Sequence, residues 1–223
     1  LSNKVKRDMG WTKLYPNYNQ IIRKYRSQWN NTQGIVLIEN IGIKDQVYSL
    51  PYEMIGGGYI ELNFNICKLK QMIQDYLNGE YINHKDYKEV YKLNVTNCSE
   101  DFMSLRLDSR FIKMVLEEEF IDKEYAMNCI DKEEPIICVD MTGLTVKEPA
   151  VHIVDGNHRA YGKLKAGKDT IEGYLVGRNM WIDALMTNKD KMFVKIFSNI
   201  MNITNYNCGI ETIAELEKKL YDI

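Results

Sequence analysis

The sequence lacks any run of about 18 apolar residues, the length with which a helix crosses a membrane. Its N-terminal stretch also lacks the apolar core of a secretory signal, since it reads LSNKVKRDMGWTKLYP. Neither a transmembrane segment nor secretion is therefore indicated. We expect a cytoplasmic protein with no membrane partner.

Cysteine is sparse and irregularly placed. No C-x-x-C pair occurs among the five cysteines, which are Cys67, Cys98, Cys129, Cys138 and Cys208. An odd and scattered set argues against a disulfide framework and against a zinc site. We expect reduced thiols, as in a cytoplasm.

An excess of positive charge is also missing. Lysine and arginine number 29 against 31 aspartates and glutamates, which gives a formal net charge of −2. A protein whose main task is to grip duplex DNA usually has a basic excess or a basic stripe. Nucleic acid is a conceivable partner, but the charge does not support it.

The informative part of the sequence lies between Ala150 and Val176. β-branched residues predict a strand that ends at Asp155 and Gly156, and the next pattern is a helix from Arg159 to Ala166. A second strand is predicted over residues 170–176. Where the first strand gives way to the helix, four polar residues gather: Asp155, Asn157, His158 and Arg159.

This turn is predicted to bind an anion. The first backbone N–H groups of a helix lack intrahelical partners, and the helix dipole favours negative charge there. His158 and Arg159 add an imidazole and a guanidinium, so phosphate is the expected ligand. Cations are otherwise unfavourable at a helix N-terminus, which favours a functional role for this pair.

The rest of the chain alternates helical and strand patterns. Apolar periodicity predicts helices over residues 17–30, 65–77 (with Asn65 as N-cap), 108–120, 125–130, 180–201 and 211–221. Short apolar or alternating runs predict strands over residues 34–39, 46–50, 59–64 and 135–140. We also expect a helix that begins at residue 85 and a short strand over residues 92–95. The predicted fold class is α+β, a small mixed β-sheet with surrounding helices.

We expect the chain to divide near residue 100. Residues 1–100 are predicted to form an N-terminal α/β extension packed on the core, and residues 101–223 to form that core together with C-terminal helices. Asp140 ends the strand predicted over 135–140 and is our second choice, after Asp155, for an acidic residue of the site. It would approach Asp155 if the two strands are neighbours.

From Pro135 to Val176 the chain resembles the core shared by the ParB N-terminal domain, the sulfiredoxins and the free serine kinases. The resemblance covers about a fifth of the chain and is carried by PIICV, VHIVDGNHRAY and TIEGYLV. It implies a ParB/sulfiredoxin-like core with helical N- and C-terminal extensions. In that superfamily a Gly-x-His-Arg or Gly-x-x-Arg turn opens a helix and holds nucleotide phosphates.

The resemblance implies roles for the residues of the turn. Gly156 would let the backbone approach the phosphates, and Asn157, His158 and Arg159 would complete the binding site. Asp155 matches the acidic position of the D-G-H-x-R version, which is typical of kinase-like and phage ParB-like members.

Asp155 and His158 are the predicted catalytic residues. Asp155 is expected to act as a general base or as a Mg²⁺ ligand, with capping of the following helix as an equally weighted alternative. Asn157 stands where sulfiredoxins carry their catalytic cysteine, so sulfinate repair is not expected.

Two functions follow as hypotheses. The first is a nucleotide-binding ParB-like protein, a Mg-dependent phosphotransferase or NTPase that uses ATP, ADP or CTP, Mg²⁺ and an unknown acceptor. The second is a non-enzymatic ParB-like DNA-binding or regulatory module whose conformation is switched by a bound nucleotide. Chromosome-partitioning relatives carry a Gly-Glu-Arg-Arg type box with further DNA-binding and dimerisation domains, for which residues 177–223 are too few, so the first hypothesis is favoured.

Overall fold

The computed structural model describes residues 14–32, 46–53, 59–80, 104–144 and 150–223. The chain forms two compact units, one made of residues 1–40 with 186–223 and the other of residues 41–185. This division differs from the predicted one, because the C-terminal helices belong with the N-terminal helix and not with the strands. The boundary predicted near residue 100 lies outside the described residues.

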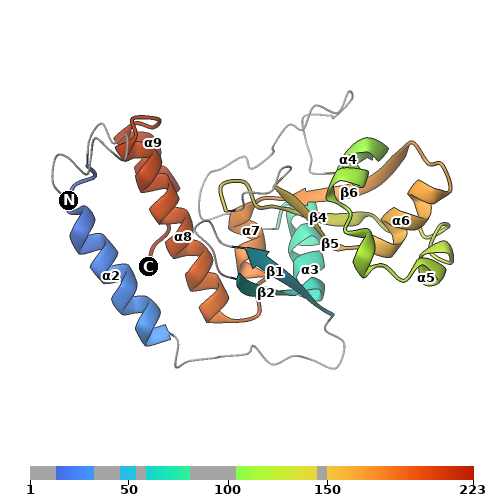
Figure 1. Cartoon of the computed structure of the whole chain (residues 1–223), viewed down its shortest axis with the longest axis horizontal. Coiled ribbons are helices and arrows are strands. Elements are labelled where there is room, and N and C mark those ends of the chain that lie inside the picture. The colour runs from blue at the N-terminus through green and yellow to red at the C-terminus, as the bar shows by residue number, and fades with distance from the viewer. Residues whose placement is uncertain (1–13, 33–45, 54–58, 81–103, 145–149) are drawn as a thin grey trace. The chain divides into compact units, whose positions relative to one another are not determined.

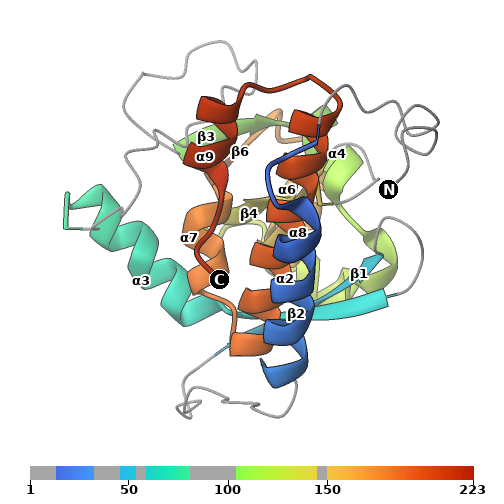
Figure 2. The ribbon, with the colours of Figure 1, turned by 90° about the vertical axis from the view of Figure 1, so that its left-hand side faces the viewer.

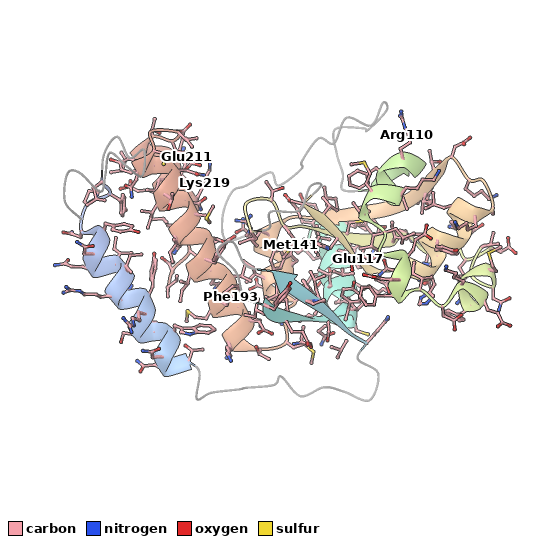
Figure 3. All side chains as sticks on the ribbon, viewed as in Figure 1. Arg110, Glu117, Met141, Phe193, Glu211 and Lys219 are labelled. Atoms are coloured by element: carbon pink, nitrogen blue, oxygen red, sulfur yellow. The ribbon has the colours of Figure 1, made fainter. Side chains whose placement is uncertain are left out.

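The first unit is helical in its described part. It contains α2 (Tyr18–Thr32), α8 (Asn188–Asn207) and α9 (Ile213–Lys219), and α8 contacts both other helices (Figure 2). The buried Asn199 side chain donates to the Tyr25 hydroxyl and pairs with both the N–H and the carbonyl of Tyr221. Lys219 Nζ, at the end of α9, lies 3.0 Å from Oε1 of Glu211, which precedes this helix (Figure 3).

The second unit contains a four-stranded mixed sheet (Figure 1). Its strands are β3 (Ser104–Asp108), β4 (Ile136–Asp140), β5 (Val151–Asp155) and β6 (Thr170–Val176), in the order β3-β6-β4-β5. β4 and β6 are parallel, whereas β3 with β6 and β4 with β5 are antiparallel. The predicted α+β class with a small mixed sheet is confirmed.

Strand periodicity places alternate residues of this sheet in one core. Ile136 and Cys138 of β4 and Ile153 of β5 pack with residues of α4 (Ser109–Val115) and α6 (Asn157–Lys165). Burial raises the pKa of the Cys138 thiol to about 12, so this thiol is uncharged and unreactive at neutral pH. α7 (Arg178–Asp183) also contacts β4, where the Trp181 indole donates to the Asp140 carbonyl.

A separate two-stranded hairpin precedes this sheet in the chain. β1 (Val47–Glu53) and β2 (Tyr59–Asn65) are antiparallel and lead directly into α3 (Ile66–Leu77). As predicted, Asn65 caps α3, because its Oδ1 accepts a 2.9 Å hydrogen bond from the Lys68 N–H. Contacts between β1 and β5 place the hairpin beside the sheet edge.

Removal of this cap tests the start of α3. Asn65→Ala is expected to lower the free energy of unfolding by about 1 kcal/mol, because the Lys68 N–H loses its acceptor. Urea unfolding followed by circular dichroism measures the change. Asn78→Ala, at the other end of the same helix, is the control and should change stability by less than about 0.5 kcal/mol. Equal losses for both variants would contradict the assigned cap.

Three predicted elements differ from the observed ones. The helix expected over 108–120 is shorter, because α4 ends at Val115 and is followed by the 3-10 turn η1 (Glu118–Phe120). Asp108, expected to begin this helix, belongs to the unpredicted strand β3. The next helix is α5 (Lys123–Met127), which begins earlier than expected because Asp122 caps it. The helix expected over 180–201 is split into α7 and α8, since Leu185 pairs with Phe64 of β2 and Thr187 caps α8.

Some predictions fall on undescribed parts of the chain. The strand over 34–39, the helix from 85 and the strand over 92–95 all lie outside the described residues. Within the described residues, the helices are too short or too polar to cross a membrane.

Candidate functional site

The turn between β5 and α6 is built around Gly156. This residue is the N-cap of α6 and has a φ of 93°, in the left-handed region that favours glycine. A Cβ at this position would lie 2.8 Å from both Arg159 Nη2 and Ile136 Cγ2. Gly156 therefore allows the Arg159 side chain to fold back against the turn.

The observed cap corrects one expectation for Asp155. α6 begins at Asn157, two residues earlier than predicted, and glycine offers no side chain to its first N–H groups. Asp155 therefore does not cap the helix. In the described part of the chain, no side chain caps the first N–H groups of α6, and the N-terminus of a helix favours an anion.

The Asp155 carboxylate is buried and binds two cations. Its side chain is 4% exposed, and its Oδ2 lies 2.9 Å from Arg159 Nη2 and 3.1 Å from Lys70 Nζ. Arg159 also donates to the Pro135 carbonyl and lies 3.4 Å from a carboxylate oxygen of Glu134. The guanidinium predicted to meet phosphate is therefore surrounded by protein acceptors.

A pocket of about 340 Å³ opens beside this turn. It has three walls, formed by β1, by the segment from the end of α4 through η1, and by β5 with the start of α6. The lining residues are Gln46, Tyr48, Ser49, Pro51, Val115, Glu117, Phe120, Ile121, His152, Ile153, Val154, Asp155, Gly156, Asn157 and His158. No lysine or arginine is among these described residues, so Arg159 does not line the pocket.

Asn157 connects two of these walls. Its Nδ2 donates to the Ile153 carbonyl at 3.0 Å, and its side chain also hydrogen-bonds the Tyr48 hydroxyl. Burial, followed by the negative charge of Glu117, raises the pKa of Tyr48, and the bond to Asn157 opposes this shift. Tyr48 therefore presents a neutral hydroxyl to the pocket at physiological pH.

His158 connects the start of α6 to the third wall. Its Nε2 accepts a 3.2 Å hydrogen bond from the Asp122 N–H, so the proton of the neutral ring is on Nδ1. The ring packs edge-on against Tyr125, with 5.1 Å between centroids. While the bond to Asp122 persists, Nε2 cannot serve as a general base, and only Nδ1–H is available to a ligand.

Asp140, the second-choice acid, lies at the opposite end of the β4–β5 pair from Asp155. β4 and β5 are neighbours, but they are antiparallel, so Asp140 pairs with Val151 whereas Asp155 pairs with Ile137. The expectation that Asp140 approaches Asp155 is therefore wrong. The Asp140 carboxylate accepts from the Thr142 N–H at 2.8 Å.

Several residues of the site were missed by sequence reasoning. Lys70, Tyr48 and Phe120 come from segments distant in sequence, and no local pattern marks them. Asp155 and Arg159 are four residues apart, but Asp155 ends β5 and Arg159 lies in α6, so the ion pair depends on the Gly156 turn and not on helical spacing.

Comparisons with known proteins add no assignment to this geometry. The chain matches no family model, and neither a curated protein nor a solved structure matches it. The interpretation of the site therefore depends on its own residues.

Proposed function

We propose that this chain is a nucleotide-binding protein, specifically a Mg-dependent phosphotransferase or NTPase, with the nucleotide phosphates at the start of α6. One observation carries the proposal: the glycine-capped N-terminus of α6 forms a wall of a 340 Å³ pocket. A pocket of this size is within the range of small-molecule sites. A ParB/sulfiredoxin-like core would use the same turn.

Backbone donors are the principal phosphate ligands in this proposal. The N–H groups of Asn157 and His158 lie in the first turn of α6, where the helix dipole favours an anion. His158 adds its Nδ1–H. Arg159 and Lys70, which do not line the pocket, neutralise Asp155, and this lowers the repulsion between its carboxylate and the phosphates.

Asp155 is the proposed Mg²⁺ ligand and acid–base group. Among the described residues, no group of three or more His, Cys, Asp and Glu side chains gathers as a metal site. A Mg²⁺ ion carried on phosphates needs only one or two protein carboxylates, and Asp155 and Glu117 are the carboxylates of the pocket wall. When bound, the metal would neutralise phosphate charge, while a carboxylate takes the proton of the attacking hydroxyl or water.

Binding is tested by thermal shift with ATP, ADP, CTP and GTP, each with and without Mg²⁺. A ligand at one hundred times its dissociation constant should stabilise the wild type by about 2.7 kcal/mol. His158→Glu should abolish this shift, because a carboxylate in the first turn repels phosphate. His158→Gln has nearly the same shape without the charge and should retain most of it.

These variants separate binding from folding. Both side chains can still accept from the Asp122 N–H, and an acidic residue near a helix N-terminus stabilises the unliganded helix by about 0.3–1 kcal/mol. A wild type that no nucleotide stabilises would refute the proposal. Binding without Mg-dependent release of phosphate or transfer to an acceptor would refute its enzymatic part and favour a nucleotide-controlled module.

A further inference from the structure

We infer that the pocket selects nucleotides whose base carries an exocyclic amino group, with Glu117 as the acceptor and Phe120 as the stacking surface. This inference rests on the proposed function, because it assigns the second end of the same pocket. The phosphate end lies at the start of α6, and the base end lies on the segment between α4 and α5.

Phe120 is the exposed aromatic residue of the pocket lining. It ends η1 with 69% of its surface exposed, whereas the next residue, Ile121, is 8% exposed and belongs to the core. The burial of Ile121 anchors the backbone next to Phe120, which lines the pocket with an exposed ring. An aromatic face in this position fits the flat face of a nucleobase, and such stacking is insensitive to the identity of the base.

Glu117 supplies the discrimination that stacking lacks. It lines the pocket, and its negative charge is near enough to raise the pKa of Tyr48, which lines the β1 wall of the same pocket. An ionised carboxylate only accepts hydrogen bonds. It therefore favours an amino group on the base and repels a carbonyl oxygen at the same position, as in carboxylate recognition of the cytosine amino group.

The two ends of the pocket are held in a fixed relation. The Asp122 N–H, two residues after Phe120, donates to His158 Nε2 in the first turn of α6. The Tyr125 ring packs against the same imidazole. Base and phosphates of one nucleotide would therefore be bound by walls that are joined directly to each other.

Two pairs of nucleotides test this inference, and the members of each pair differ at the exocyclic group and at the adjacent ring nitrogen, which is an acceptor in ATP and CTP and an N–H donor in ITP and UTP. ATP carries a 6-amino group where ITP carries a 6-oxo group, and CTP carries a 4-amino group where UTP carries a 4-oxo group. Isothermal titration on the whole chain should give at least about tenfold tighter binding for the amino member of whichever pair binds. Glu117→Gln should reduce this ratio to near one, because an amide both donates and accepts.

Phe120 is tested with a matched exposed residue as control. Phe120→Ala should weaken the amino and oxo nucleotides alike, by about tenfold, and Phe120→Tyr should restore affinity. Met114→Ala removes a residue of similar exposure, 65%, that does not line the pocket and should change nothing. The inference would be overturned if the wild type bound the amino and oxo nucleotides of both pairs equally well. It would also be overturned if Glu117→Gln left the ratio of the two affinities unchanged. A wild type that binds no nucleotide would overturn the proposed function itself.

Discussion

Replacing Gly162 by alanine is expected to destabilise the protein by about 3 kcal/mol, although alanine is the better helix former by about 1 kcal/mol. Gly162 lies inside α6 against α5, and a Cβ there would meet the Ala126 carbonyl oxygen at 2.3 Å. A backbone oxygen cannot rotate away as a side chain can. The two helices would have to separate, which opens the core on this side of the sheet.

Thermal unfolding measures this effect. A loss of 3 kcal/mol should lower the melting temperature by about 6–12 °C. Gly167→Ala is the control, because Gly167 ends the same helix with a φ of 72° and has nothing within 4 Å of an added Cβ. That variant should lose about 1 kcal/mol from its left-handed backbone alone. A Gly162→Ala protein as stable as the wild type would contradict the close packing of α5 on α6.

The second large effect is expected at Asp155. Asp155→Ala should lower the free energy of unfolding by about 3–5 kcal/mol, because it leaves the buried Arg159 guanidinium with only the exposed Glu134 carboxylate, 3.4 Å away, as its counter-charge. The Arg159 side chain is only 11% exposed, and its Nε is buried without a hydrogen-bond partner among the described residues. Denaturant unfolding in urea measures the change.

The two cations on Asp155 provide the controls. Lys70 binds the same oxygen, but its side chain is 44% exposed, so Lys70→Ala should lose only about 0.2–1 kcal/mol. Adding Arg159→Met to Asp155→Ala removes the orphaned charge and should recover part of the loss. Arg159→Met could instead lower the free energy of unfolding by the same amount in the wild type and in Asp155→Ala. In that case the two residues would be energetically independent.

The local elements could be predicted because their signals are local. Asn65 is followed by an apolar helical pattern, and it caps α3 as expected. β5, its glycine turn and β6 were also predicted closely, since β-branched runs and Gly156 and Gly167 mark their limits. Breaks that depend on tertiary pairing were missed, such as the one at Leu185, where the chain bonds to Phe64 instead of continuing a helix.

The candidate site was predicted only along one wall. Asp155 through Arg159 are contiguous in sequence, so a strand–turn–helix pattern could locate them. Tyr48 and Glu117 reach the same pocket from segments about 40 to 110 residues away, and nothing in their neighbourhoods indicates it. Arg159 was assigned to phosphate from its charge, whereas its position in space is set by Asp155.

The ion pair between Lys70 and Asp155 also bears on how this protein can be divided by recombination or by design. The strand–turn–helix motif that sequence reasoning located lies between residues 135 and 176, yet Lys70 of α3 pairs with its Asp155 and Tyr48 of β1 lines the pocket beside it. A fragment that starts near residue 100 would keep every residue of the motif and lose one wall of the pocket. The compact unit that contains every wall of the pocket is the segment 41–185, so a transferred copy of the site has to include the hairpin and α3.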